Sequence, residues 1–117
     1  MKKIYLSLPM TVMPTDIGER YKELCDYVDT LPIYKDYEKV GPINIEKFLE
    51  EPNYMEKALP YSYCMGKDIE NLIECDAIIM GRGWEKGPGC RVERFAAQTY
   101  NKDIIYQLYE NWRKLYW

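Results

Sequence analysis

The 117-residue chain contains no histidine, the side chain most often used for proton transfer and metal binding near neutral pH. Acid–base or nucleophilic chemistry must therefore fall to carboxylates, tyrosines, cysteines or lysines. The four cysteines form no C-x-x-C pair, and without histidine a zinc site would need all four of them together. We therefore expect no metal and no cofactor, and we expect free thiols in a reducing, cytoplasmic setting.

Long apolar runs and an excess of basic residues are also missing. The apolar runs are only a few residues long, so no segment is expected to span a membrane. The N-terminal stretch MKKIYLSLPM lacks the full apolar region and the cleavage site of a signal peptide. The net charge of −3 argues against nucleic acid as the main partner, because phosphate contacts need a basic face. The length predicts a single domain over residues 1–117.

Patterns typical of strands and helices alternate along the chain. We expect strands over 2–8, 38–45, 77–80 and 103–108, and helices over 16–31, 62–76 and 89–101. Residues 46–55 are expected to form a short helix or a loop. In the second of these helices, the apolar stripe is formed by Met65, Ile69, Leu72 and Ile73. The order of elements predicts a compact α/β domain with a mainly parallel sheet.

The glycine-rich stretch GRGWEKGPG, residues 81–89, directly follows the apolar strand expected over 77–80. It is not a phosphate-binding loop, because no G-K-[ST] follows it. It is also not a dinucleotide fingerprint, which belongs after the first strand of such a fold. Ligands of open parallel sheets bind at the carboxyl ends of the strands. The glycine-rich stretch is therefore where we expect a binding site.

Glu93 lies near the start of the helix expected over 89–101. At helical spacing it falls opposite the polar stripe of that helix and alongside Gly89, Ala96 and Tyr100. The first turn lies at the positive end of the helix dipole, which favours an ionised carboxylate. Two interpretations stay open at this point. Glu93 is either a nucleophile in a cleft or a glutamate that accepts hydrogen bonds from backbone N–H groups at the helix start.

Three other residues are candidates for the same site. Asp68 lies at the edge of the apolar stripe of its helix and is either a site residue or a boundary residue that pairs locally. Tyr5 lies in the first strand, where its ring can pack inside while its hydroxyl reaches the strand end. Trp84 lies in the glycine-rich stretch and either stacks on a flat ligand or covers the loop.

The segments IYLSLPMT, KDIENLIECDAIIM and GWEKGPGCRVERFAA together resemble the nucleoside 2-deoxyribosyltransferase superfamily, and in particular its small DUF4406-like phage and bacterial branch. The resemblance implies a three-layer, flavodoxin-like or Rossmann-like domain with four to five strands. It also implies that Glu93 attacks C1′ of a deoxyribonucleoside to form a covalent glycosyl-enzyme, the two-step logic of retaining glycosidases. Tyr5 matches a tyrosine that hydrogen-bonds this glutamate, and Asp68 matches an aspartate associated with binding and protonation of the base.

The resemblance further assigns substrate-binding residues to two strand ends, namely Leu8, Pro9, Met10, Gly83, Trp84, Gly87 and Gly89. Two of these positions depart from the family pattern. Leu8 stands where the family has a glycine, which we expect to narrow the pocket. Gly87 stands where a serine or an acidic residue is common, so a phosphate or base contact is expected to be missing.

The sequence therefore predicts a nucleoside or nucleotide N-deoxyribosyltransferase or N-glycoside hydrolase, with a small-molecule substrate and neither nucleic acid nor membrane as partner. A non-catalytic nucleotide-binding module of the same fold is the alternative, and Leu8 is the main reason for it. A second alternative is a structural or oligomerising protein. The aromatic tail, about residues 109–117, carries Tyr109, Trp112 and Tyr116 at helical spacing, so a homo-oligomer is expected.

Overall fold

The structure of the protein is a computed structural model that describes residues 1–9, 17–42 and 60–108. The predictions for Met10, for 46–55 and for the aromatic tail fall outside these residues. The elements run in the order β1 (Lys3–Ser7), α1 (Ile17–Asp29), β2 (Glu38–Val40), α3 (Tyr61–Ile73), β3 (Ala77–Met80), the 3-10 turn η3 (Trp84–Lys86), α4 (Pro88–Thr99) and β4 (Asp103–Tyr106).

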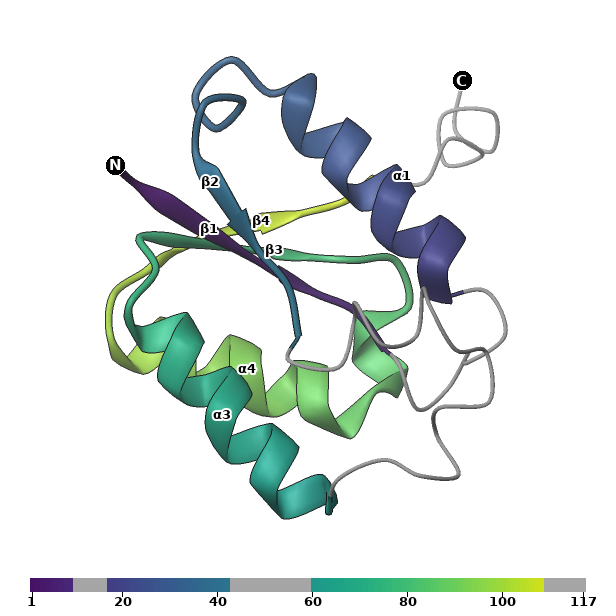
Figure 1. Cartoon of the computed structure of the whole chain (residues 1–117), viewed down its shortest axis with the longest axis vertical. Helices are drawn as coiled ribbons and strands as arrows, with labels where there is room; N and C mark the ends of the chain where they lie inside the picture. The colour runs from purple at the N-terminus through teal and green to yellow at the C-terminus, as the bar shows by residue number, and fades with distance from the viewer. Residues whose placement is uncertain (10–16, 43–59, 109–117) are drawn as a thin grey trace.

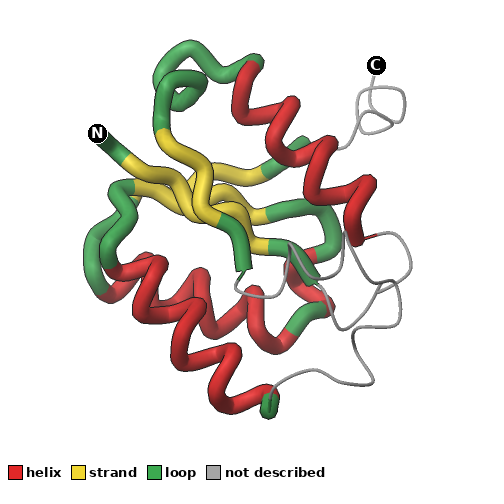
Figure 2. Tube along the Cα trace, in the orientation of Figure 1, coloured by secondary structure: helices red, strands yellow, loops and turns green. Residues whose placement is uncertain are grey.

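The strands of the described residues form one four-stranded, wholly parallel sheet in the order β2-β1-β3-β4. Helix α1 covers one face of the sheet, and α3 and α4 cover the other (Figure 1). Figure 2 shows the same three layers, with the sheet in yellow between the red helices. The predicted three-layer α/β domain with a parallel sheet is therefore confirmed.

The two central strands carry the core. Along β1, Ile4, Leu6 and the following Leu8 pack on the α1 side, whereas Tyr5 packs on the side of α3 and α4. This alternation follows from the two-residue period of a strand. All four residues of β3 are buried, as expected for a central parallel strand with helices on both faces.

The chain leaves the two central strands in opposite directions. From β1 it continues to the edge strand β2, and from β3 it continues to the opposite edge strand β4. The connections therefore diverge at the carboxyl ends of β1 and β3, where Ser7 pairs with Met80. The N–H of Gly81 donates to the Ser7 carbonyl at 2.8 Å and holds these two strand ends together. Such a reversal of strand order is where ligands bind in open α/β sheets.

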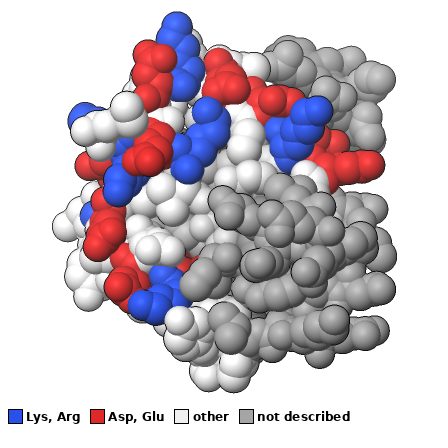
Figure 3. Space-filling view, viewed as in Figure 1, with Lys and Arg blue, Asp and Glu red and all other residues white. Residues whose placement is uncertain are grey.

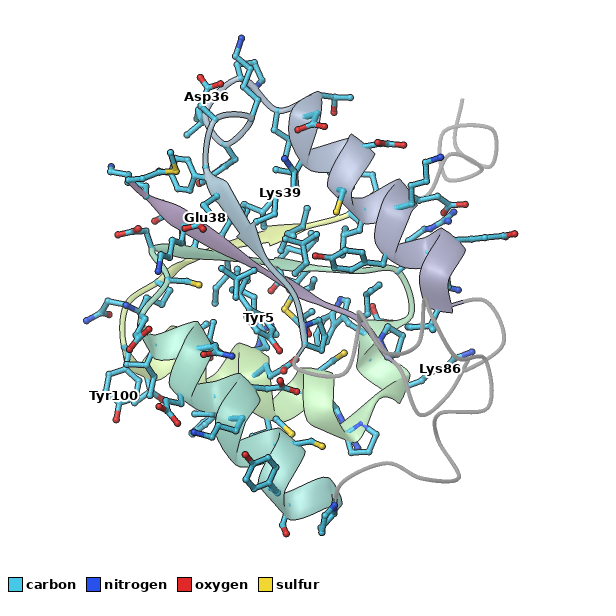
Figure 4. The ribbon with its side chains drawn as sticks, in the orientation of Figure 1. Tyr5, Asp36, Glu38, Lys39, Lys86 and Tyr100 are labelled. Carbon is cyan, nitrogen blue, oxygen red and sulfur yellow. The ribbon has the colours of Figure 1, made fainter. Side chains whose placement is uncertain are left out.

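Two residues assigned to buried helix faces are exposed. Ile73 is 38% exposed and Tyr100 is 56% exposed, whereas Leu72 is only 1% exposed. Ile73 is the last residue of α3, and Tyr100 follows the last residue of α4. Figure 4 shows Tyr100 at the edge of the molecule, pointing away from the sheet. The apolar pattern of each helix extends beyond the last residue that the sheet and the other helices cover. Periodicity alone therefore predicted the wrong burial for Ile73 and Tyr100.

The surface in the view of Figure 3 carries both signs of charge. Lysine and arginine side chains alternate there with aspartate and glutamate side chains and do not form a block of one sign. Several of these groups pair, as Lys39 does with Asp29 at 2.7 Å. Among the described residues, none of the helices combines the length and the apolar character needed to cross a membrane.

Candidate active site

Glu93 faces the sheet from the first half of α4. It is 4% exposed, and it shares the buried face of this helix with Cys90 and Ala97. The spacing of these three residues, i, i+3 and i+7, follows one face of a helix. Phe95 lies on the outer side and is 70% exposed. The prediction that Glu93 points away from the wet face of its helix is confirmed.

Both carboxylate oxygens of Glu93 accept a hydrogen bond from a side chain of β1. The hydroxyl of Tyr5 donates to Oε2 at 2.7 Å, and the hydroxyl of Ser7 donates to Oε1 at 2.6 Å. Both donors are completely buried. Hydrogen bonds to an ionised acceptor are short and strong. The carboxylate is therefore held by the side chains of β1. The alternative interpretation, in which Glu93 accepts hydrogen bonds from backbone N–H groups at the start of its own helix, does not describe these contacts.

Ser7 was not among the residues selected from the sequence. The signal that identifies it is its distance of two residues from Tyr5 within one strand, which puts both side chains on the same face of the sheet. A serine at the end of an apolar strand is also a buried polar group that needs a partner. The carboxylate of Glu93 is that partner.

Burial raises the pKa of Glu93 from 4.5 to about 7. The hydrogen bonds from Ser7 and Tyr5 oppose this rise, and the nearby charge of Asp68 adds to it. Burial and the neighbouring carboxylates also raise the pKa of Tyr5 well above its usual value, so its phenol stays protonated and remains a donor. The site therefore holds a carboxylate that changes its ionisation near neutral pH, a property common among catalytic groups.

Asp68 reaches the same cluster from α3. It is partly buried, and its charge acts on both Glu93 and Tyr5. The structure thus brings together the three residues predicted to be catalytic, from β1, α3 and α4. Cys90 lies beside them, where burial raises the pKa of its thiol to about 12 and keeps it protonated.

The glycine-rich loop packs directly on the segment that follows β1. Gly83, the residue before η3, has a φ of +84°, a conformation that favours glycine. Gly87 precedes α4, and a Cβ added there would lie 3.0 Å from Cβ and 3.2 Å from Cα of Pro9. The two segments approach each other so closely that a side chain at position 87 would require Pro9 to shift by a few tenths of an ångström. Glycine at this position therefore fixes the start of α4 relative to β1.

Gly87→Ala is expected to destabilise the fold by about 1–3 kcal/mol, because the added methyl group must displace the backbone of Pro9. Gly66→Ala in α3 is the matched control. A Cβ at Gly66 meets nothing within 4 Å, and alanine is the better helix former by about 0.5–1 kcal/mol. Chemical denaturation of both variants checks the pair. Equal stabilities would contradict the close approach at Gly87.

Side chains of α1 and of the segment after β4 also hold the glycine-rich loop. The guanidinium of Arg20 in α1 donates to the carbonyl oxygen of Arg82, and the side chain of Arg82 pairs with Glu23. The N–H of Arg82 donates to the side-chain oxygen of Gln107 at 3.1 Å. The loop is therefore anchored to α1 and to the segment after β4, which limits how far the first turn of α4 can shift.

Trp84 contacts the side of α4 that faces β4. Its ring lies 5.7 Å from the Tyr106 ring, and the Arg94 guanidinium lies 5.3 Å from its centre. Arg94 also donates to the Tyr106 hydroxyl at 2.7 Å. Glu93 instead points toward β1. These contacts are those of a residue that covers the loop, and stacking of Trp84 on a ligand stays a prediction.

The remaining predicted substrate-binding residues do not all lie on the same face of the sheet as Glu93. Leu8 is buried in the apolar cluster on the α1 side, on the opposite face of the sheet from Glu93. The structure therefore does not bring its side chain to the carboxylate, and Leu8 does not narrow the space beside it. Pro9 is buried at the strand end against Gly87, and Gly89 is partly buried in the first turn of α4.

No metal-binding group was found in the described part of the chain. Within residues 1–9, 17–42 and 60–108, no three or more aspartate, glutamate, cysteine or histidine side chains lie close enough to hold a metal ion. The cysteines Cys25, Cys64, Cys75 and Cys90 are all free thiols. What the site offers chemically is thus the buried carboxylate of Glu93, a second carboxyl group on Asp68 and two hydroxyl donors.

The chain was compared with known proteins. A comparison with curated proteins gave no match. Among solved structures, the fold is similar to that of a 2-desoxiribosyltransferase from Leishmania mexicana, with a TM-score of 0.59 and 24% sequence identity. The similarity covers 91% of this chain and 63% of the other, so the chain spans less than two thirds of that protein. Residues 2–106 match the family model described as Domain of unknown function (DUF4406). The chain therefore belongs to the DUF4406 family.

Proposed function

We propose that the protein cleaves the N-glycosidic bond of a 2′-deoxynucleoside or its 5′-phosphate and passes the deoxyribosyl group to a second base or to water. The observation that carries this proposal is the buried Glu93 carboxylate, which hydroxyls hold at both oxygens where β1 and β3 end. The fold that the chain shares with the 2-desoxiribosyltransferase from Leishmania mexicana supports the same chemistry.

In the first step, a carboxylate oxygen of Glu93 forms a bond to C1′ of the sugar as the bond between C1′ and the base nitrogen breaks. The electron pair of the broken bond goes to the base, and Asp68 supplies the proton that neutralises it. Glu93 must be ionised for this attack. The proposed step requires Asp68 to carry the proton while Glu93 is ionised.

In the second step, a base nitrogen or a water molecule attacks C1′ from the other side and breaks the bond to Glu93. The Glu93 carboxylate leaves, the incoming group passes its proton to the Asp68 carboxylate left by the first step, and the configuration at C1′ is retained overall. Tyr5 keeps its proton throughout, because burial and the neighbouring carboxylates raise its pKa well above the usual value. Its role is to hold the Glu93 carboxylate in place.

Incubation with a panel of 2′-deoxynucleosides and their 5′-monophosphates, followed by chromatography, tests this proposal. We expect free base from at least one member, at a rate that rises with pH around 7 because the ionised form of Glu93 reacts. Glu85→Gln is the control, because Glu85 is an exposed residue of the glycine-rich loop, and this variant should keep full activity. Ligand-induced thermal stabilisation without base release would support the nucleotide-binding module instead.

A further inference from the structure

Ser7 has a contact that the proposed roles of Glu93, Asp68 and Tyr5 do not explain. It is the last residue of β1 and is completely buried, and a buried hydroxyl is unfavourable unless it is hydrogen-bonded. Its hydroxyl lies 2.6 Å from Oε1 of Glu93, while Tyr5 occupies Oε2 at 2.7 Å. A single strand thus supplies one donor to each oxygen of a carboxylate on α4.

We propose that Ser7 is a positioning residue of the site, whose hydroxyl fixes the plane of the Glu93 carboxylate for attack on C1′. The last torsion of a glutamate side chain is broad, so a carboxylate held at one oxygen can still turn about it. Donors at both oxygens remove this freedom. The kinetic part of this inference rests on the proposed function, whereas the effect of Ser7 on the carboxylate does not.

The electrostatics of the site agree with the geometry. Of the two hydrogen bonds that oppose the rise in the Glu93 pKa, the one from Ser7 has the larger effect. Over the part of the chain that the structure describes, the other titratable groups that face Glu93 are the Tyr5 phenol on β1, Asp68 on α3 and the Cys90 thiol on α4. Loss of the Ser7 hydroxyl is therefore expected to raise the Glu93 pKa further and to leave less of the reactive carboxylate at neutral pH.

Cys90 provides a control within the same cluster. Its buried thiol interacts with the Ser7 hydroxyl and lies one turn before Glu93. Cys90→Ala removes this second neighbour of Ser7 and leaves the hydrogen bond to Glu93. An effect that comes from the Ser7–Glu93 bond should appear in Ser7→Ala and be much smaller in Cys90→Ala.

The test compares wild type with Ser7→Ala, Ser7→Thr and Cys90→Ala. The Glu93 pKa is followed by NMR of the ¹³C-labelled carboxyl group, and base release is followed against pH. Ser7→Ala is expected to raise the Glu93 pKa by about one pH unit and to lower kcat at pH 7 by roughly ten- to a hundred-fold. Its KM should stay within about two-fold. Ser7→Thr keeps a hydroxyl and should restore both values.

The outcomes separate this inference from the proposed function. An unchanged Glu93 pKa in Ser7→Ala would overturn the inference, even if wild type releases base. A loss of kcat that Ser7→Thr does not restore, with Cys90→Ala equally impaired, would show a purely structural role and would also overturn it. A raised pKa in Ser7→Ala, with no base released by wild type, would contradict the proposed reaction and still support the hold of Ser7 on Glu93.

Discussion

Glu93→Gln is expected to lower base release by on the order of 10⁴-fold or more, because an amide cannot attack C1′. Glutamine has nearly the same size and shape as glutamate, so the chain should stay folded. The hydroxyls of Tyr5 and Ser7 can still donate to the amide oxygen and accept from the amide nitrogen. Single-turnover chromatography with excess enzyme measures the loss at the chemical step.

The matched control for this loss is Glu85→Gln, which makes the same chemical change at an exposed residue of η3. Its rate should equal that of wild type. If Glu93→Gln kept more than about a tenth of the wild-type rate, a loss of less than 1.4 kcal/mol in transition-state stabilisation, Glu93 would not be the nucleophile. Base release would then have to be assigned to another group.

The same substitution is expected to stabilise the protein above neutral pH. Burial raises the Glu93 pKa from 4.5 to about 7, so the folded state binds this proton more tightly than the unfolded chain does. Ionisation of Glu93 therefore removes stability as the pH rises from about 4.5 to about 7, and the loss is complete above that range. A shift of this size corresponds to on the order of 3 kcal/mol. Glu93→Gln lacks this loss.

Urea denaturation of both proteins at pH 5 and at pH 8 measures the effect. The difference in the free energy of unfolding should change in favour of Glu93→Gln between these two pH values. Comparing two pH values cancels any constant change in packing or hydrogen bonding. Glu70→Gln is the control, because Glu70 is exposed and pairs with Lys67 at 3.3 Å. Parallel pH dependence of wild type and Glu93→Gln would mean that the carboxylate is well solvated.

The sequence predicted the layers and the sheet because these depend on local patterns. The wholly apolar run AIIM indicated a buried parallel strand, and β3 is buried at every position. Helical spacing placed Glu93 on the covered face of its helix, which is also correct. Spacing failed at Ile73 and Tyr100, because a helix wheel does not show where the sheet stops covering a helix.

The contacts of the site were harder to predict, because they join residues that are far apart in the chain. Tyr5 and Glu93 are separated by 88 positions, and the family resemblance rather than any spacing paired them. The two-residue period of β1 could have identified which of its side chains face the site. It places Ser7 on the same face as Tyr5, and it places Leu8 on the opposite face with Ile4. The close approach of Gly87 to Pro9 leaves no pattern in the sequence.

The most direct test of the account is to identify the covalent intermediate. Wild type and Glu93→Gln would be mixed with the most reactive substrate of the panel, quenched in acid within the first turnover, and examined by intact-mass and peptide mass spectrometry. The account predicts a mass increase equal to one deoxyribosyl group, or its phosphate, on the wild-type peptide that contains Glu93 and on no peptide of the variant. Base release with the added mass on a different residue, or with no added mass at any quench time, would contradict Glu93 as the nucleophile.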